Sequence, residues 1–135
     1  MKNILITGAS QGIGKATAVE AAKNKMFVGI NYNKNLEAAQ SCLDEVKLAG
    51  GDGMILHCDV ADSNAVKEMF NKFLAKVKTI DGVFNNAGIT GPISQIQDLD
   101  PAELKTLIDT NVSGAFYVAQ ESARAMINQN YGAIV

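Results

Sequence analysis

Residues 7–14, Thr-Gly-Ala-Ser-Gln-Gly-Ile-Gly, constrain the fold of this chain more than any other stretch. They follow three apolar residues, 4–6, and precede a run of good helix formers at residues 15–22, so the order is strand, tight turn and helix. Glycine tolerates positive φ and leaves bare backbone. A helix that begins near Gly12 directs free N–H groups and its positive dipole end to the same place. The stretch predicts a binding site for the pyrophosphate of a dinucleotide, although a glycine turn without a ligand is the alternative for the motif alone.

The composition is that of an ordinary globular domain. The 135 residues are 47% hydrophobic and 19% charged, which suits one domain with a buried core. A net charge of -2 provides no basic surface for nucleic acid or an anionic membrane. No secretory signal or membrane-spanning stretch is recognisable. Cys42 and Cys58 do not make a disulfide framework or a metal cluster, so we expect reduced thiols, no metal and a cytoplasmic location.

The rest of the chain alternates apolar runs with helical patterns. Strands are predicted at residues 26–30, 54–58, 82–85 and 132–135, and helices at residues 36–49, 63–77 and 101–127. Asp62 and Asp100 precede helices as N-caps, and Pro101 suits a first helical position. Strands separated by helices of about a dozen residues or more form parallel βαβ units. The prediction is a doubly wound parallel sheet, the three-layer α/β/α Rossmann architecture, which reaches its fifth strand at the end of the sequence.

Polar residues or glycines follow four of the predicted strands. They are the glycine stretch, Asn31, Asp59 and Asn86. Because the carboxyl ends of parallel strands share one edge of a sheet, these residues are expected to lie together, and ligands bind at that edge. Four such signals at one edge are harder to explain as structural features than a single glycine turn.

With these residues, the chain resembles the short-chain dehydrogenase/reductase family. The resemblance rests on T-G-x-x-x-G-x-G at residues 7–14, D-V at 59–60, N-N-A-G at 85–88 and Asn111 inside the long predicted helix, and it covers the whole chain. The nearest branch is that of the sugar dehydrogenases and 3-oxoacyl carrier-protein reductases. The resemblance implies an NAD(P)(H)-dependent oxidoreductase that interconverts a secondary alcohol and a ketone on a small molecule.

The resemblance also implies roles for residues. Asp59 would bind the adenine amino group and Val60 would offer its backbone N–H to the ring, although Asp59 could instead only cap a turn. Asn111 would open the long helix locally and hold a water of the proton relay, against the alternative of a plain exposed asparagine. Asn85 is expected to tie strands together. The implied cofactor-binding residues are Gly8, Ser10, Gln11, Gly12, Ile13, Gly14, Asn31, Asp59, Val60, Asn86, Ala87 and Gly88, and the implied catalytic residue is Asn111.

Asn31 bears on the choice of cofactor. It lies where NAD-preferring folds often carry an acid for the ribose 2′-hydroxyl. An amide does not repel a 2′-phosphate, and Lys34 or Lys15 could attract one, so NADP is favoured over NAD. Against this, Gln11 replaces an arginine that is frequent in NADP-preferring relatives. His57 is predicted to be a core or partly buried residue rather than a catalytic one.

The family's tyrosine–lysine pair is missing from the sequence. None of the three tyrosines is followed by a lysine four positions later. We therefore expect this chain to be the N-terminal, nucleotide-binding half of a longer reductase, truncated before the chemistry and inactive alone. The apolar helix at residues 101–127 suggests a homo-oligomer. The alternative is a complete nucleotide-binding or protein-interaction module without catalysis.

Overall fold

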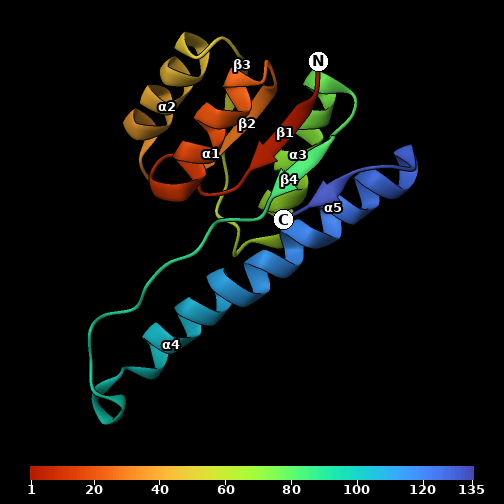
Figure 1. Cartoon of the computed structure of the whole chain (residues 1–135). Coiled ribbons are helices and arrows are strands. Elements are labelled where there is room, and N and C mark those ends of the chain that lie inside the picture. The colour runs from red at the N-terminus through yellow and green to blue at the C-terminus, as the bar shows by residue number, and fades with distance from the viewer.

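A parallel sheet of five strands in the order β3-β2-β1-β4-β5 forms the centre of the protein in the computed structural model, which describes residues 1–135 (Figure 1). All four neighbouring pairs run parallel. The strand order reverses direction between β1 and β4, which makes the gap between these two strands the switch point of the sheet. The predicted doubly wound fold is therefore confirmed. The strands are β1 (Asn3–Ile6), β2 (Phe27–Tyr32), β3 (Asp52–His57), β4 (Gly82–Phe84) and β5 (Ala133–Ile134).

Helices cover both faces of the sheet (Figure 1). Helices α1 and α2 pack on one face, and α3 and α5 pack on the other. None of the helices combines the length and the apolar character that crossing a bilayer requires. The helices are α1 (Gly12–Lys23), α2 (Leu36–Leu48), α3 (Ser63–Val77), α4 (Pro101–Ile108) and α5 (Ala115–Gln129), with a short 3-10 turn at Ile96–Asp98.

The core consists of two apolar clusters, one on each face of the sheet. Neighbouring residues of a strand point to opposite faces, so Leu5 and Phe27 pack under α3 and α5, whereas Ile6 and Val28 pack under α1 and α2. A strand buried on both faces shows a continuous apolar run rather than an alternating one. This explains why the runs at β1 and β2 were recognisable in the sequence.

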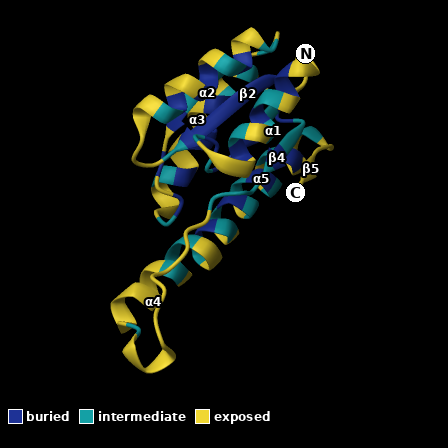
Figure 2. Cartoon of the chain, turned by 60° about the vertical axis from the view of Figure 1, so that its left-hand side comes forward, coloured by how far each residue is buried: buried dark blue, intermediate teal, exposed yellow.

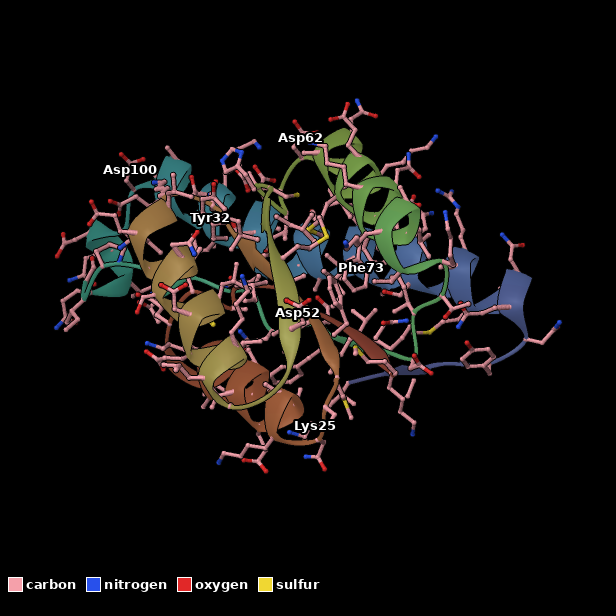
Figure 3. All side chains as sticks on the ribbon, turned by 90° about the horizontal axis from the view of Figure 1, so that it is seen from above. Lys25, Tyr32, Asp52, Asp62, Phe73 and Asp100 are labelled. Atoms are coloured by element: carbon pink, nitrogen blue, oxygen red, sulfur yellow. The ribbon has the colours of Figure 1, made fainter.

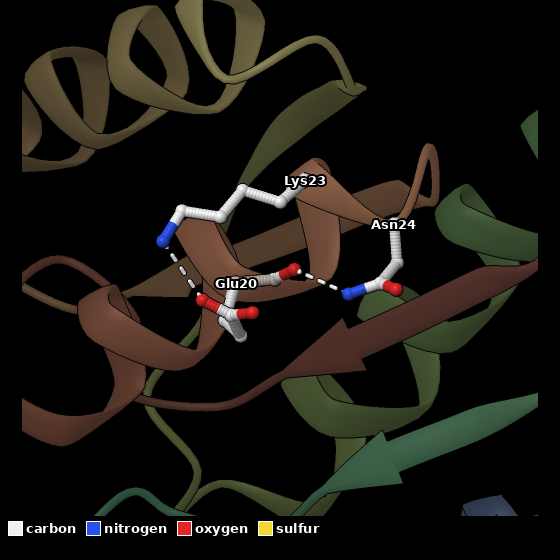
Figure 4. Close-up of polar contacts among 3 residues, drawn as sticks. All are labelled: Glu20, Lys23 and Asn24. Atoms are coloured by element: carbon white, nitrogen blue, oxygen red, sulfur yellow. Dashed lines mark hydrogen bonds and ion pairs between the residues drawn. The ribbon is translucent and has the colours of Figure 1, made fainter.

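Local hydrogen bonds define the helix ends. The Asp62 carboxylate accepts hydrogen bonds from the backbone N–H groups of Asn64 and Ala65, and Asp100 caps α4 in the same way, which confirms both predicted caps. At the other end of α1, Figure 4 shows the Asn24 amide donating to the Glu20 carbonyl oxygen at 3.0 Å, beside an ion pair between Lys23 and Glu20.

Two strands extend two residues beyond their predicted bounds. Strand β2 continues through Asn31 to Tyr32, because its ladder with β3 extends to the pair Tyr32–His57. Strand β3 begins at Asp52 and includes Gly53, a residue that resembles a turn signal in the sequence. A Cβ at Gly53 would lie 2.4 Å from the Val28 carbonyl oxygen, so the neighbouring strand requires a glycine there.

The long helix predicted at residues 101–127 is divided in the structure. Helix α4 ends at Ile108, a π-helical segment spans Asp109–Gly114, and α5 runs to Gln129. The expectation that the helix opens around Asn111 is confirmed. Residues 89–112, which we call the arm, include no buried residue and project away from the sheet (Figure 2).

Candidate nucleotide-binding site

The glycine turn after β1 has a backbone shape that favours glycine. Gly8 and Gly12 have φ of 62° and 57°, in the left-handed region that residues with a side chain rarely adopt. Gly14 is required by packing instead, because a Cβ there would lie 2.5 Å from the Gly8 carbonyl oxygen and 2.7 Å from the Asn86 side-chain nitrogen. The turn and the start of α1 therefore pack backbone against backbone.

The N-terminus of α1 is open. Its N-cap residue, Gln11, makes no capping hydrogen bond with its side chain, and no atom lies within 4 Å of a Cβ placed on Gly12. Ile13, the next residue, is 72% exposed. Free N–H groups, bare backbone and the positive end of a helix dipole meet at this point, which fits a diphosphate group.

Thr7 joins the glycine turn to the loop after β4. Its hydroxyl oxygen, which is fully buried, accepts hydrogen bonds from the backbone N–H groups of Asn86 and Ala87 at 2.9 and 3.0 Å. The Asn86 amide returns two hydrogen bonds to the carbonyl oxygens of Thr7 and Gly8. The two loops on either side of the switch point are therefore one rigid unit. The sequence analysis did not assign this role to Thr7, although the residue opens the glycine motif.

Asn31 braces the same unit from β2. Its side-chain oxygen accepts the Gly8 N–H at 3.0 Å, and its backbone oxygen accepts the Ala9 N–H at 2.8 Å. Its side-chain nitrogen donates to the carbonyl oxygens of Leu56 and Cys58. The side chain is 2% exposed, because it lies inside β2 and points into the sheet edge. The structure thus gives the Asn31 side chain a structural role, and the cofactor contact predicted for this residue stays a prediction.

Asp59 and Val60 follow β3 at the same edge. Asp59 is exposed and accepts the Ala61 N–H with one carboxylate oxygen, so it does cap a turn and retains a second oxygen toward solvent. Val60 is buried against the π-helical segment, where a Cβ on Gly114 would lie 2.8 Å from a Val60 methyl group. This close contact brings the helix and the residues after β3 together.

Asn111 fastens the loop that leaves the N-N-A-G motif. Its side chain accepts the Ile89 N–H and donates to the Ile89 carbonyl oxygen, both at 2.8 Å, and it lies 3.3 Å from a Cβ placed on Gly88. Asn85 has a structural role, as expected, but its side chain binds the Ala115 carbonyl oxygen of α5 at 2.9 Å rather than a strand. The loop is thus positioned by the π-helical segment.

The ends of β2 and β3 form a rim that is partly exposed, with Tyr32 half-buried and His57 exposed. Tyr32 and His57 are register partners, and their rings lie 5.3 Å apart. In Figure 3, Tyr32 lies at the same edge as Asp62, while Lys25 and Asp52 mark the opposite ends of the strands. His57 is exposed, so the prediction of a core or partly buried histidine is wrong. The strand ends at His57, so this ring lies at the edge of the sheet, where it packs on Tyr32.

Neighbouring groups and burial shift the pKa values of one lysine and of both cysteines. Lys15 forms an ion pair with Glu45 at 2.8 Å, and that hydrogen bond raises the pKa of Lys15. Burial raises the pKa of Cys42 to about 11 and that of Cys58 to about 12. Both thiols are free and buried, so they remain protonated at neutral pH and are unreactive.

Known proteins resemble this chain in both sequence and fold. The family model for short chain dehydrogenase matches residues 2–135. The chain belongs to the short-chain dehydrogenase family. It is 34% identical to a 3-oxoacyl-[acyl-carrier-protein] reductase of Staphylococcus aureus and 34% identical to a 3beta-hydroxysteroid dehydrogenase of Mediterraneibacter gnavus, each over 99% of this chain. These matches cover 54% and 48% of the two relatives, so the chain spans about half the length of the curated relatives it matches.

Solved structures of short-chain dehydrogenases share the fold. An NAD+-bound xylitol dehydrogenase aligns with a TM-score of 0.94 and 34% identity, over 98% of this chain and 51% of that one. A metagenomic short-chain oxidoreductase in complex with NADP aligns with a TM-score of 0.92 and 28% identity, over 98% and 60%. Of these two solved structures, one therefore holds NAD+ and the other NADP.

Proposed function

We propose that this short-chain dehydrogenase chain binds a nicotinamide dinucleotide at the switch point and forms the nucleotide-binding part of an oxidoreductase. One observation supports this most strongly. An uncapped helix N-terminus and open space beside Gly12 lie between two loops that hydrogen bonds hold rigid. A preformed anion site of this kind requires no reorganisation when the ligand binds.

The neighbouring residues fit the remaining parts of the cofactor. Backbone around Ser10, Gln11, Gly12 and Ile13 would hold the pyrophosphate. The free oxygen of Asp59 and the backbone of Val60 would hold the adenine, and Ala87 and Gly88 would lie along the nicotinamide ribose. When bound, the nicotinamide ring gives or takes a hydride. Asn111 would keep the loop after Gly88 in place and hold a water for proton transfer.

The proposed reaction is the interconversion of a secondary alcohol and a ketone on a small molecule. The proton at the substrate oxygen needs a positioned acid. No tyrosine in these 135 residues has a lysine four positions later. We therefore assign proton transfer to residues outside this chain segment, and we expect the segment alone to be inactive. The proposed location is the cytoplasm.

NADP is the proposed cofactor in preference to NAD. The residues from the end of β2 to the start of α2, positions 31–36, include no acid, so nothing there repels a 2′-phosphate. The Asn31 side-chain amide is hydrogen-bonded to the backbone of Gly8, Leu56 and Cys58. The exposed residues that follow Asn31 would therefore contact the adenosine ribose. Lys15 is held by Glu45, which leaves Lys34 as the nearby cation without an ion-pair partner.

A homo-oligomer through the long helix is also part of the proposal. Exposed apolar side chains recur every fourth residue along α4, the π-helical segment and the start of α5. Such a stripe on a projecting arm is typical of a surface that packs against a partner. The members of the stripe are Leu104, Ile108, Val112 and Phe116.

Titration of the full-length protein with NADPH and NADH, followed by cofactor fluorescence, tests the site. We expect saturable binding in the wild type and at least tenfold weaker binding in Gly12→Asp, because a carboxylate would occupy the anion position. Gly50→Asp is the matched control, since Gly50 also has positive φ but lies at the end of α2 away from the site. The absence of binding by either nucleotide would refute the proposal.

A further inference from the structure

Gln129, the last residue of α5, has no assigned role in the site described above. Its amide oxygen accepts the N–H of Ile80, just before β4, at 3.1 Å, and its amide nitrogen donates to the Ile80 carbonyl oxygen at 2.6 Å. The same nitrogen donates to the Tyr131 carbonyl oxygen at 2.9 Å. One side chain thus joins the end of a helix to the segment that enters β4, 49 residues earlier in the chain.

The partner of Gln129 is a buried stretch of backbone. Ile80 is fully buried, and buried N–H and C=O groups need hydrogen-bond partners. The Gln129 amide supplies both an acceptor and a donor, as a neighbouring strand would. An apolar side chain of similar length would supply neither, so this contact is specific to an amide.

A second amide ties the other end of α5 to the other end of β4. Asn85 directly follows β4, and its side chain donates at 2.9 Å to the carbonyl oxygen of Ala115, the first residue of α5. Between the two ties, Val118 and Met126 of α5 pack into the core. Apolar packing is non-directional, whereas the two amide contacts are directional. Together they fix the position of α5 along β4.

The lengthwise position of α5 bears on the nicotinamide end of the proposed site. The π-helical segment runs directly into α5, and its Asn111 holds Ile89 with two hydrogen bonds of 2.8 Å and lies 3.3 Å from a Cβ placed on Gly88. Within the same loop, the Thr7 hydroxyl holds the backbone N–H groups of residues 86–87. The second half of the loop therefore depends on the long helix and not on the glycine turn.

We propose that Gln129 is a positioning residue, which together with Asn85 fixes α5 along β4 and so sets Asn111 against the loop for the nicotinamide ribose. Without the Gln129 contact, the end of α5 is free to shift, and hydrogen bonds such as those of Asn111 weaken when their atoms move apart by about 0.5 Å. The adenosine diphosphate end is less affected, because Asn31 holds the glycine turn from β2. This inference rests on the proposed function, because it requires a dinucleotide at the switch point.

The experiment compares each dinucleotide with its fragment that lacks the nicotinamide ribose: NADPH with 2′-phospho-ADP, and NADH with ADP. Calorimetry measures the four dissociation constants for the full-length wild type and for Gln129→Met. The dinucleotides should bind about fivefold more weakly to the variant, the contribution of about one hydrogen bond, whereas the fragments should change by less than about twofold. A merely structural role would not separate a dinucleotide from its fragment.

Two further variants complete the test. Gln120→Met is the matched control, because Gln120 lies in the same helix and is exposed, and it should leave all four constants unchanged. Gln129→Glu keeps an acceptor for the Ile80 N–H but loses the donor, so its dinucleotide binding should lie between that of the wild type and that of Gln129→Met. It replaces Gln129→Met in the comparison if that protein does not fold.

The outcomes separate the two levels of the proposal. Unchanged dinucleotide binding in the Gln129 variants, or an equal loss for dinucleotide and fragment, would overturn the positioning role and leave the proposed function intact. Failure of the wild type to bind NADPH and NADH would overturn the dinucleotide site itself, and this inference with it.

Discussion

The carboxyl edge of the sheet and the arm differ in where their polar and apolar groups point. At the edge, the side chains of Thr7, Asn31 and Asn86 are turned inward and hydrogen-bonded to backbone. In the arm and at the start of α5, apolar side chains such as Val112 and Phe116, which are 57% and 61% exposed, point to solvent. The polar side chains at the edge therefore have hydrogen-bond partners within the chain, whereas these apolar side chains remain largely exposed.

The two regions illustrate two kinds of binding surface. At the edge, buried polar side chains fix bare backbone, so the binding surface exists before a ligand arrives. The stripe of Leu104, Ile108, Val112 and Phe116 is only partly covered by the rest of the chain, and large exposed apolar patches of this kind mark interaction surfaces. Substitutions at the edge should therefore affect stability and binding together, whereas those in the arm should affect association alone.

Gly14→Ala should produce the largest effect. The new Cβ would meet the Gly8 carbonyl oxygen at 2.5 Å and the Asn86 side chain at 2.7 Å. Since both groups are fixed, we expect a loss of about 3 kcal/mol in the free energy of unfolding together with loss of nucleotide binding. Urea unfolding and NADPH titration measure the two effects. Gly12→Ala, with open space but positive φ, should cost only about 1 kcal/mol. Equal costs at the two glycines would show that the edge is not rigid.

Asn31→Ala should have the next largest effect. It leaves the Gly8 N–H and the carbonyl oxygens of Leu56 and Cys58 without their side-chain partner. We expect a loss of about 2 kcal/mol in stability and weaker binding of NADPH and NADH by the same factor, because the turn and not the ribose contact is disturbed. Asn33→Ala, an exposed neighbour, is the control for stability. A change for NADPH alone would restore Asn31 as the residue that selects the cofactor.

Phe116→Ser should have the smallest effect on the chain itself. Because the ring is mostly exposed, the stability of the separated subunit should change by less than about 0.5 kcal/mol. The change removes an anchor from the apolar stripe, so the full-length oligomer should dissociate at concentrations where the wild type remains associated. Analytical ultracentrifugation measures this dissociation. An oligomer unaffected by Phe116→Ser and by Ile108→Ser would place the interface elsewhere.

Several features of the chain were determined by the sequence alone. The strand, glycine turn and helix at residues 4–23 depend on neighbours in the chain, and so do the caps at Asp62 and Asp100. The apolar runs that alternate with helical patterns predicted the parallel sheet. These signals are local, since a dihedral preference, a cap or an apolar period involves residues only a few positions apart.

The tertiary structure decided which side chains face the site. Asn31 and His57 are both polar residues at the end of an apolar run in the sequence. Both lie in the ladder between β2 and β3, but the Asn31 side chain is buried and hydrogen-bonded to β3, whereas the His57 side chain is exposed. Thr7 acquires its role only from Asn86 and Ala87, about 80 residues later. The reason is geometric. Strand register and the packing of one loop on another are set by contacts between distant segments, and a shift of one residue reverses the direction of every side chain in a strand.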